Sequence, residues 1–305
     1  MTNNIPWVEK YRPQNFENII LNNENKILFN EIINKNIFPN ILLYGPPGTG
    51  KTTTIINIIN RFQELNNERD KSLVIHLNAS DDRGIDIIRN NISQFVNSNN
   101  LFTKGIKFII LDEVDYMTKN AQLALKQLIK INTNNIRYCL ICNYISRIDD
   151  SLIDEFIVIR FNQLPENDII DFLDNINKNE DLKMSRETIL NIKKFYNSDI
   201  RSMINYMQNN VNNNSIETIS QDLHDSIFKI HTTKNLKNFI EFIYNSSNKL
   251  QIDYRIILKK YIGFLILNKN SIIQEKDINY DLQFLYYNTN NNKSIHYLYY
   301  LLSNK

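Results

Sequence analysis

The residues best suited to chemistry form one short run, GPPGTGKT, from Gly45 to Thr52. The run fits the pattern G-x-x-x-x-G-K-[ST], in which glycines let backbone N–H groups turn toward a phosphate chain. Lys51 is expected to reach the β- and γ-phosphates, and the Thr52 hydroxyl to face Mg²⁺. An apolar run precedes the motif and an amphipathic run follows it, so a helix N-terminus should add positive potential. We therefore predict a nucleoside triphosphate site formed by Gly45, Pro46, Pro47, Gly48, Thr49, Gly50, Lys51, Thr52 and Thr53.

Two carboxylates follow a second apolar run, at Asp112 and Glu113 in FIILDEVD. Ligands of open α/β sheets bind at the carboxyl ends of strands, so we expect these residues near the phosphates. Asp112 is predicted to hold Mg²⁺ through water, and Glu113 to orient and deprotonate the water that attacks the γ-phosphate. An acidic strand-end loop without chemistry is the alternative. Asn143 follows a third run, RYCLIC, and could orient the same water if its strand is a neighbour.

Five short apolar runs must position these residues. Amphipathic stretches separate them, and runs of this kind are typical of parallel strands covered on both faces. The fold class is therefore α/β, with a five-stranded parallel sheet. The runs are ILLY (41–44), LVIHL (73–77), KFIILD (107–112), RYCLIC (137–142) and FIVIRF (156–161).

The remainder of the chain carries helical patterns only. After residue 164, apolar positions recur three or four apart, which predicts a small helical domain. The Asn-rich segment NNVNNNS (209–215) separates it from further amphipathic stretches that reach Lys305. We predict three domains: residues 1–163 for nucleotide binding, 164–210 as a small helical domain, and 211–305 as a third, all-helical domain.

Composition limits the function classes. The chain has 305 residues, with 35 Lys and Arg against 33 Asp and Glu. Its net charge of +2 is too small to give the whole chain an electrostatic attraction for nucleic acid. A DNA-binding surface would have to be local. No apolar stretch approaches the ~20 residues of a membrane span, and we expect an intracellular, soluble protein without a membrane partner. Two cysteines cannot form a disulfide scaffold, and Cys139 and Cys142 should face opposite sides of one strand.

These motifs together resemble the AAA+ clamp loaders, specifically the small subunits of replication factor C. The similarity covers roughly residues 5–208. PWVEKYRP (6–13) is similar to the family's N-terminal box, whose residues Tyr11, Arg12 and Pro13 would lie by the adenine. LNASDDRGIDIIRNNI (77–92) resembles its most distinctive internal box, and NYISRI (143–148) its sensor 1. SDIRSMINYMQ (198–208) resembles sensor 2, which would place Arg201 near the γ-phosphate.

The resemblance implies a fold and a machine. The fold would be a RecA-like AAA+ domain with a helical lid and a collar that joins five subunits. ATP binding, with Mg²⁺, would drive opening of a sliding clamp around primer-template DNA. The partners would be other clamp loader subunits in a hetero-pentamer, the clamp and the DNA. Arg83 and Arg89 would follow DNA phosphates, while Ile92 and Phe95 would either face the clamp or pack in the core.

The sequence departs from the family at one catalytic position. Small subunits carry Ser-Arg-Cys after sensor 1, and its arginine acts on the ATP of the neighbouring subunit. Alignment places Asp154, Glu155 and Phe156 there. An arginine finger contributes about 10³–10⁵ in rate, so we expect this chain to bind and hydrolyse ATP without activating a neighbour. In the helix after LDEVD, which resembles the family's Walker B segment, the family's paired arginines correspond to Lys126 and Gln127. The family's glycine before sensor 2 corresponds to Ser198.

Two other readings stay open. The chain could be an ATP-binding structural subunit without turnover, in which nucleotide only holds an interface. It could also be another AAA+ DNA motor or remodeller. For location, the resemblance implies the nucleus, and a divergent version would also suit a viral replication compartment.

Overall fold

The computed structural model describes residues 5–68, 70–81, 91–97, 105–131, 135–211, 221–232, 235–250, 252–268, 281–282, 284–286 and 294–303. The chain forms two compact units. Unit 1 comprises Met1–Asn179 and Tyr196–Asn205, and unit 2 comprises Glu180–Phe195 and Tyr206–Lys305. The division into three domains at residues 163 and 210 stays a prediction.

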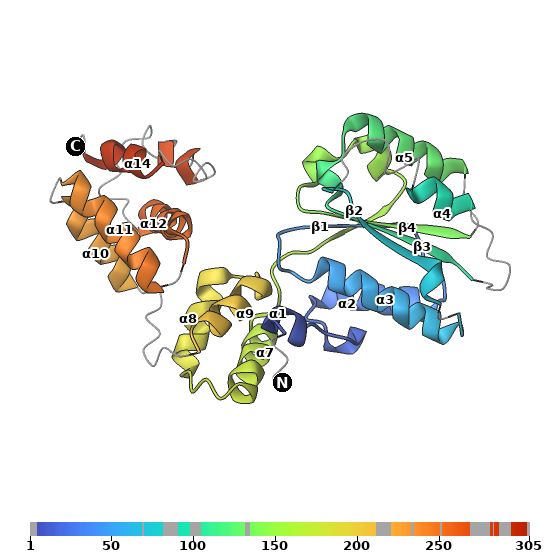
Figure 1. The fold of residues 1–305 in the computed structure, drawn as a ribbon, viewed down its shortest axis with the longest axis horizontal. Coiled ribbons are helices and arrows are strands. Elements are labelled where there is room, and N and C mark those ends of the chain that lie inside the picture. The colour runs from blue at the N-terminus through green and yellow to red at the C-terminus, as the bar shows by residue number, and fades with distance from the viewer. Residues whose placement is uncertain are drawn as a thin grey trace. The chain divides into compact units, whose positions relative to one another are not determined.

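Unit 1 alternates strands with helices, as Figure 1 shows. Its first elements are α1 (Trp7–Lys10), η1 (Phe16–Asn18), α2 (Asn23–Asn34), β1 (Ile41–Tyr44), α3 (Lys51–Leu65), η2 (Lys71–Leu73), β2 (Val74–Asn78), α4 (Ser93–Asn97) and β3 (Lys107–Asp112). They are followed by η4 (Val114–Tyr116), α5 (Lys119–Ile131), β4 (Ile136–Cys142), η5 (Ile145–Arg147), α6 (Asp150–Ile153), β5 (Ile157–Arg160) and α7 (Glu166–Asn179). Helix α8 (Arg186–Tyr196) belongs to unit 2 except for its last residue, and α9 (Ile200–Asn209) begins in unit 1 and ends in unit 2.

The five predicted strands form one parallel sheet in the order β2-β3-β4-β1-β5. This confirms the predicted fold class. The register pairs Leu111 with Leu140, so β3 and β4 are neighbours and end at the same edge. The second strand begins one residue later than predicted, because the Asp70 carboxylate accepts from the Ser72 N–H and residues 71–73 form a 3₁₀ turn.

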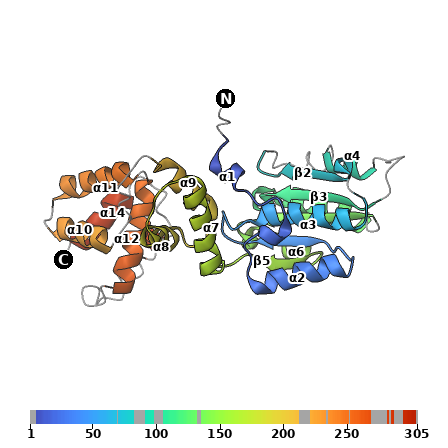
Figure 2. The ribbon, with the colours of Figure 1, turned by 90° about the horizontal axis from the view of Figure 1, so that it is seen from below.

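Helices cover both faces of the sheet. On one face, α2 and α3 pack over a core that includes Phe29, Ile58 and Phe108, and they lie side by side in both views (Figures 1 and 2). The other face, on the side of α5, buries a second core. Cys139 belongs to the first core and Cys142 to the second, which confirms that they face opposite sides.

The candidate clamp-facing residues lie beside the second core. Ile92 is completely buried in it, and Phe95 packs against it while half-buried. Core packing therefore accounts for Ile92. The neighbouring arginines, Arg83 and Arg89, lie outside the described residues.

The secondary structure elements in the described part of unit 2 are helices. Its later helices are α10 (Gln221–Thr232), α11 (Leu236–Leu250), α12 (Tyr254–Asn268) and α14 (Ser294–Ser303). They pack around a core that contains Phe239, Ile243, Tyr261 and Leu298. None of the helices in the described ranges is long and apolar enough to cross a membrane.

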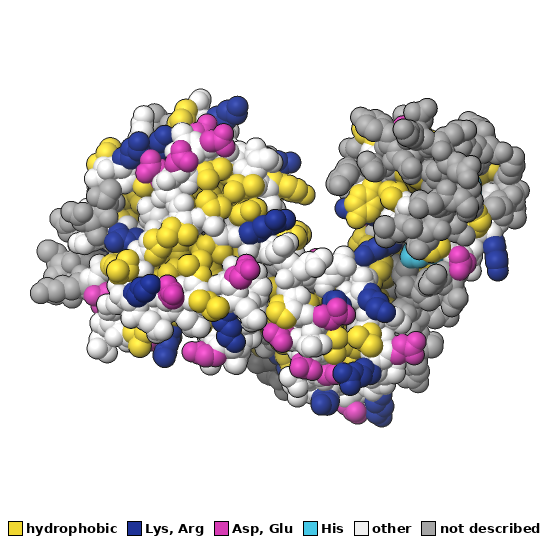
Figure 3. All heavy atoms as spheres, turned by 180° about the vertical axis from the view of Figure 1, so that it is seen from behind, with side chains coloured by type: hydrophobic (Ala, Val, Ile, Leu, Met, Phe, Trp, Pro, Cys, Tyr) yellow, Lys and Arg dark blue, Asp and Glu magenta, His cyan; other side chains and the backbone are white. Residues whose placement is uncertain are grey.

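The surface carries mixed charge. Figure 3 shows basic and acidic side chains interspersed over the coloured face of unit 1, with small apolar patches between them. This arrangement agrees with the small net charge of +2. Among the described strands β5 lies at the edge of the sheet and pairs with β1 alone. Its Ile157 and Val158 are 46% and 39% exposed.

Candidate functional site

A cavity in unit 1 brings together four parts of the chain that are far apart in sequence. They are the N-terminal segment, the glycine-rich loop with the start of α3, the carboxyl ends of β3 and β4, and residues from α7 and α9. The lining residues are Val8, Glu9, Tyr11, Arg12, Pro13, Asn18, Ile19, Ile20, Pro47, Gly48, Thr49, Gly50, Lys51, Thr52, Thr53, Asp112, Glu113, Asn143, Phe172, Ile200, Arg201 and Ile204.

Lys51 is held within the glycine-rich loop. Its ammonium donates to the carbonyls of Gly45 at 2.7 Å and Pro46 at 2.8 Å, and to the side-chain oxygen of Asn143 at 3.0 Å. The residue is only 7% exposed. Burial lowers the pKa of Lys51 below its usual 10.5, and the charge of Asp112 opposes that shift. The lysine is thus positioned beside the loop by acceptors that an anion could replace.

Thr52 and Asp112 meet at the start of α3. The Thr52 hydroxyl donates to Asp112 Oδ2 at 2.7 Å. The pair joins the loop to the end of β3 and places a hydroxyl oxygen beside a carboxylate oxygen. Oxygen ligands of this kind suit Mg²⁺, which is commonly held by one or two carboxylates together with substrate phosphates.

Glu113 begins the turn after β3 in a left-handed conformation, with φ of 56°. Its backbone N–H donates to Asp112 Oδ1 at 2.9 Å. The other Asp112 oxygen accepts from Thr52, so both carboxylate oxygens are engaged. A non-glycine residue in this region is uncommon and is often found at functional sites.

Asn143 follows β4, and its backbone contacts the buried carboxylate of Asp115. The Asn143 backbone N–H donates weakly to Asp115 Oδ1, at 3.4 Å. Asp115 is 5% exposed, and its Oδ2 has no hydrogen-bond partner in the described part of the chain. Sequence reasoning missed Asp115, although its place in LDEVD is a signal that could have identified it.

The loop is also held from the side of α9. A Cβ at Gly48, where φ is +72°, would collide with the Asp199 carboxylate, so the position requires glycine. The Ile200 N–H donates to the Gly48 carbonyl at 3.1 Å, and Asp199 caps α9 through the Ser202 N–H. These contacts bring Arg201 into the cavity, where its charge adds to the lowering of the Lys51 pKa.

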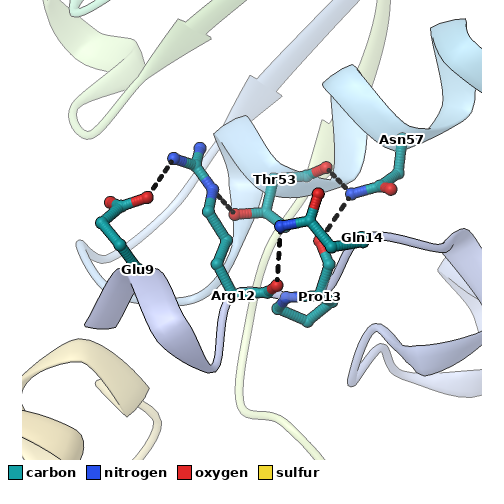
Figure 4. Close-up of polar contacts among 6 residues, drawn as sticks. All are labelled: Glu9, Arg12, Pro13, Gln14, Thr53 and Asn57. Carbon is teal, nitrogen blue, oxygen red and sulfur yellow. Dashed lines mark hydrogen bonds and ion pairs between the residues drawn. The ribbon is translucent and has the colours of Figure 1, made fainter. Parts of the chain in front are cut away.

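Arg12 and Asn57 form the hydrogen bonds between the N-terminal segment and α3 that Figure 4 shows. Arg12 Nε donates to the Thr53 hydroxyl at 3.2 Å, and its guanidinium pairs with Glu9 at 3.4 Å. Asn57 donates to the Pro13 carbonyl at 3.1 Å. The segment therefore lines the cavity as part of the same network as the glycine-rich loop.

The structure brings most of the predicted site residues to this cavity. The exceptions in the loop are Gly45 and Pro46, which do not line it and whose carbonyls accept from Lys51. Sequence reasoning missed the apolar lining from Phe172, Ile200 and Ile204. Their helical spacing was visible, but the pattern does not show which apolar residues face the cavity and which face the core.

The position aligned with the arginine finger carries an ion pair. Glu155 Oε1 lies 3.4 Å from the Lys130 ammonium, and the Glu155 side chain is 27% exposed. Two other arginines, Arg147 and Arg160, lie in this region of the sequence. Arg147 lies over the rings of Tyr116 and Tyr144, and Arg160 is on the edge strand β5.

Comparison with known proteins identifies relatives. The family "ATPase family associated with various cellular activities (AAA)" matches residues 41–164. "Replication factor C subunit 3" of Saccharomyces cerevisiae is 37% identical over 72% of this chain and 65% of its own length. "Replication factor C subunit 5" of Homo sapiens is 40% identical over 67% and 60%. "Probable replication factor C subunit 5" of Caenorhabditis elegans is 35% identical over 81% and 68%. The alignment thus spans less than two thirds of the yeast and human relatives.

Solved structures give the same fold. The Thermotoga maritima RuvB Holliday junction branch migration motor superposes with a TM-score of 0.57, over 84% of this chain and 80% of that one. The sequence identity is 14%, so this likeness concerns the fold alone.

Proposed function

Because the chain belongs to the replication factor C small-subunit family of AAA ATPases, we propose that it is an ATP-driven subunit of a clamp loader. In this proposal it acts in DNA replication, within a hetero-oligomer that opens a sliding clamp and places it on primer-template DNA. The observation that carries the ATPase part is the convergence of Lys51, Asp112, Glu113, Asn143 and Arg201 on one cavity. The loading part is supported by the relatives.

The glycine-rich loop would bind the phosphates. Its N–H groups and the start of α3 offer positive potential, and Lys51 lies beside it with three acceptors at 2.7–3.0 Å. Arg201 adds a second cation to the cavity. These groups fit a triphosphate, whose charge would compensate the buried ammonium.

Thr52 and Asp112 would hold Mg²⁺. Their adjacent oxygens, 2.7 Å apart, form a donor set that fits a hard cation. When bound, the ion supplies charge neutralisation for the phosphates. Glu113 would accept the proton of the attacking water, and Asn143 would orient that water from the neighbouring strand end.

DNA binding and assembly belong to the same proposal. Arg83 and Arg89 are proposed to contact phosphates without reading sequence, which suits a machine that acts at primer junctions of any sequence. The partners would be related but non-identical subunits and the ring clamp. We place this work in the nucleus. The yeast, human and nematode relatives do not support the alternative location in a viral replication compartment.

The chain is proposed not to supply an arginine finger. The Lys130–Glu155 ion pair supports this, because a carboxylate at that position is engaged within the chain and would repel a neighbour's γ-phosphate. A homo-oligomer would then lack this finger at every interface, which favours a hetero-oligomer.

One experiment separates this function from its alternatives. The complex assembled on the chain is tested for clamp loading onto primed DNA with wild-type, Glu113→Gln and Lys51→Ala subunits. We expect Glu113→Gln to reduce loading strongly while the complex still assembles. Unchanged loading with Glu113→Gln, together with failed assembly of Lys51→Ala, would instead identify a structural ATP-binding subunit. A ring of six identical chains would identify a different AAA motor.

A further inference from the structure

Asn57 is a buried polar residue on α3 that links two parts of the site. Its side chain is 6% exposed and lies six residues after Lys51, the first residue of the helix. The amide nitrogen donates to two carbonyls, that of Pro13 at 3.1 Å and that of Thr53 at 2.8 Å (Figure 4). Thr53 lies one turn earlier in the same helix, so the bond to Pro13 is the one that joins separate elements.

The Pro13 carbonyl accepts the bond from Asn57. Proline lacks a backbone N–H, so the carbonyl is the only backbone group through which Pro13 can hydrogen bond. A buried amide donor is costly when unpaired, and therefore the Asn57 side chain and the Pro13 peptide restrain one another. The bond fixes which way this peptide group faces.

The neighbouring peptide group is restrained as well. Gln14 Nε2 donates to the Arg12 carbonyl at 3.2 Å, and Arg12 Nε donates to the Thr53 hydroxyl (Figure 4). Thus two successive carbonyls of the N-terminal segment accept from side-chain amides, and α3 holds the segment at Thr53 and at Asn57. Gln14 and its bond are exposed, whereas Asn57 is buried.

The cavity geometry indicates what this segment contacts. A triphosphate on the loop and the start of α3 would leave the rest of the nucleotide to the remaining lining. That lining includes Tyr11, Arg12 and Pro13, together with Ile19 and Ile20. Apolar side chains and restrained peptide groups form a suitable wall for a planar base.

We propose that Asn57 is a positioning residue for nucleotide recognition. It holds the Arg12–Pro13 wall against the base and ties that wall to the helix whose first residues face the phosphates. The proposal rests on the proposed ATP-binding function. It predicts that loss of the Asn57 amide weakens recognition of the adenosine part and leaves recognition of the phosphate part unchanged.

The test compares two probes, ATP and inorganic tripolyphosphate, each titrated with Mg²⁺ into the full chain. Asn57→Ala should raise the Kd for ATP about tenfold, the scale expected for one lost hydrogen bond. The Kd for tripolyphosphate should stay at the wild-type value. Asn57→Leu, which keeps about the same size, removes the donor and adds no charge, should repeat this split. Asn60→Ala is the matched control, because it is the same substitution at a half-buried position on the same helix, and should change neither constant.

Two results would overturn the proposal. One is ATP affinity in Asn57→Ala equal to that of the wild type. The other is equal weakening of both probes, which would indicate general damage to the loop; thermal unfolding of each variant checks the fold independently. A wild-type chain that binds neither ATP nor tripolyphosphate would refute the proposed ATP function itself, which is a distinct outcome.

Discussion

The Lys51 ammonium donates a hydrogen bond to the side-chain oxygen of Asn143 at 3.0 Å. This bond joins the first residue of α3 to the residue that follows β4, across 92 positions of sequence. The lysine proposed to bind phosphate and the amide proposed to orient water are therefore coupled. A bound phosphate would compete with Asn143 for the ammonium and would release the amide toward the reacting water.

This coupling predicts that two substitutions of Asn143 affect ATP affinity to different degrees. Asn143→Ala removes a neutral acceptor, so ATP affinity should change by less than about threefold while turnover falls. Asn143→Asp places a carboxylate beside Lys51, which would hold the ammonium more tightly and repel the phosphates, and should weaken ATP about tenfold or more. Nucleotide titrations and steady-state ATP turnover test both. Equal ATP affinity in the two variants would contradict the coupling.

The contact between Thr52 and Asp112 predicts a magnesium requirement at this edge. Asp112→Asn removes the negative charge, and Thr52→Val removes the hydroxyl with little change in volume. Each should raise the Mg²⁺ concentration needed for half-maximal ATP turnover, with the larger shift for Asp112→Asn because a carboxylate is the stronger ligand for the ion. The measurement is turnover against Mg²⁺ at saturating ATP. An unchanged Mg²⁺ dependence in both variants would place the metal elsewhere.

The ion pair between Lys130 and Glu155 leads to a gain-of-function test. Glu155→Arg should restore a cation at the proposed interface and increase ATP turnover at the neighbouring site within the assembled complex, by about tenfold or more. Lys130→Ala is the control. It breaks the same pair, which is partly exposed and should contribute no more than about 1 kcal/mol to stability, without supplying a finger. No increase with Glu155→Arg would mean that this position does not face a neighbour's nucleotide.

A half-buried histidine predicts acid sensitivity of unit 2. His224 stacks on Phe264, with ring centroids 4.9 Å apart, and its Nε2 is buried without a hydrogen-bond partner in the described part of the chain. Burial lowers its pKa below 6.5, with Asp225 opposing and Lys260 adding to the shift. The folded form therefore binds fewer protons than the unfolded form, and stability is lost as pH falls below about 6.5. His224→Phe keeps the stacking and removes the titration.

The measurement is the free energy of unfolding between pH 7 and pH 5. We expect the variant to lose less stability over this interval than the wild type. Part of the wild-type loss should persist in the variant, because the pKa of His231 is also lowered by burial. Identical pH profiles for the wild type and the variant would show that His224 is not responsible.

The sheet was predictable because its signal is local. Five apolar runs specified five strands, and the run from Lys107 to Asp112 matches β3 residue for residue. The glycine-rich loop was equally clear, since its spacing encodes its conformation. The predicted roles of Asp112, Glu113 and Asn143 depended on strand order, which periodicity does not specify; the register of β3 with β4 supplies it.

Other parts of the site could not be read from the sequence. Asn57 resembles many asparagines of this chain, and only the fold places it against Pro13, 44 residues away. Likewise, Lys130 and Glu155 are unremarkable as sequence, and their pairing depends on how α5 lies beside the turn before β5. Contacts between distant residues decide such roles, and a single sequence carries no record of them.

The most direct measurement is the native mass and composition of the complex captured on this chain in ATP and Mg²⁺. We expect five related but non-identical subunits, with a ring-shaped clamp retained when ATP is present and lost with the Lys51→Ala chain. A ring of six identical chains, or a monomer whose mass is indifferent to ATP, would contradict it.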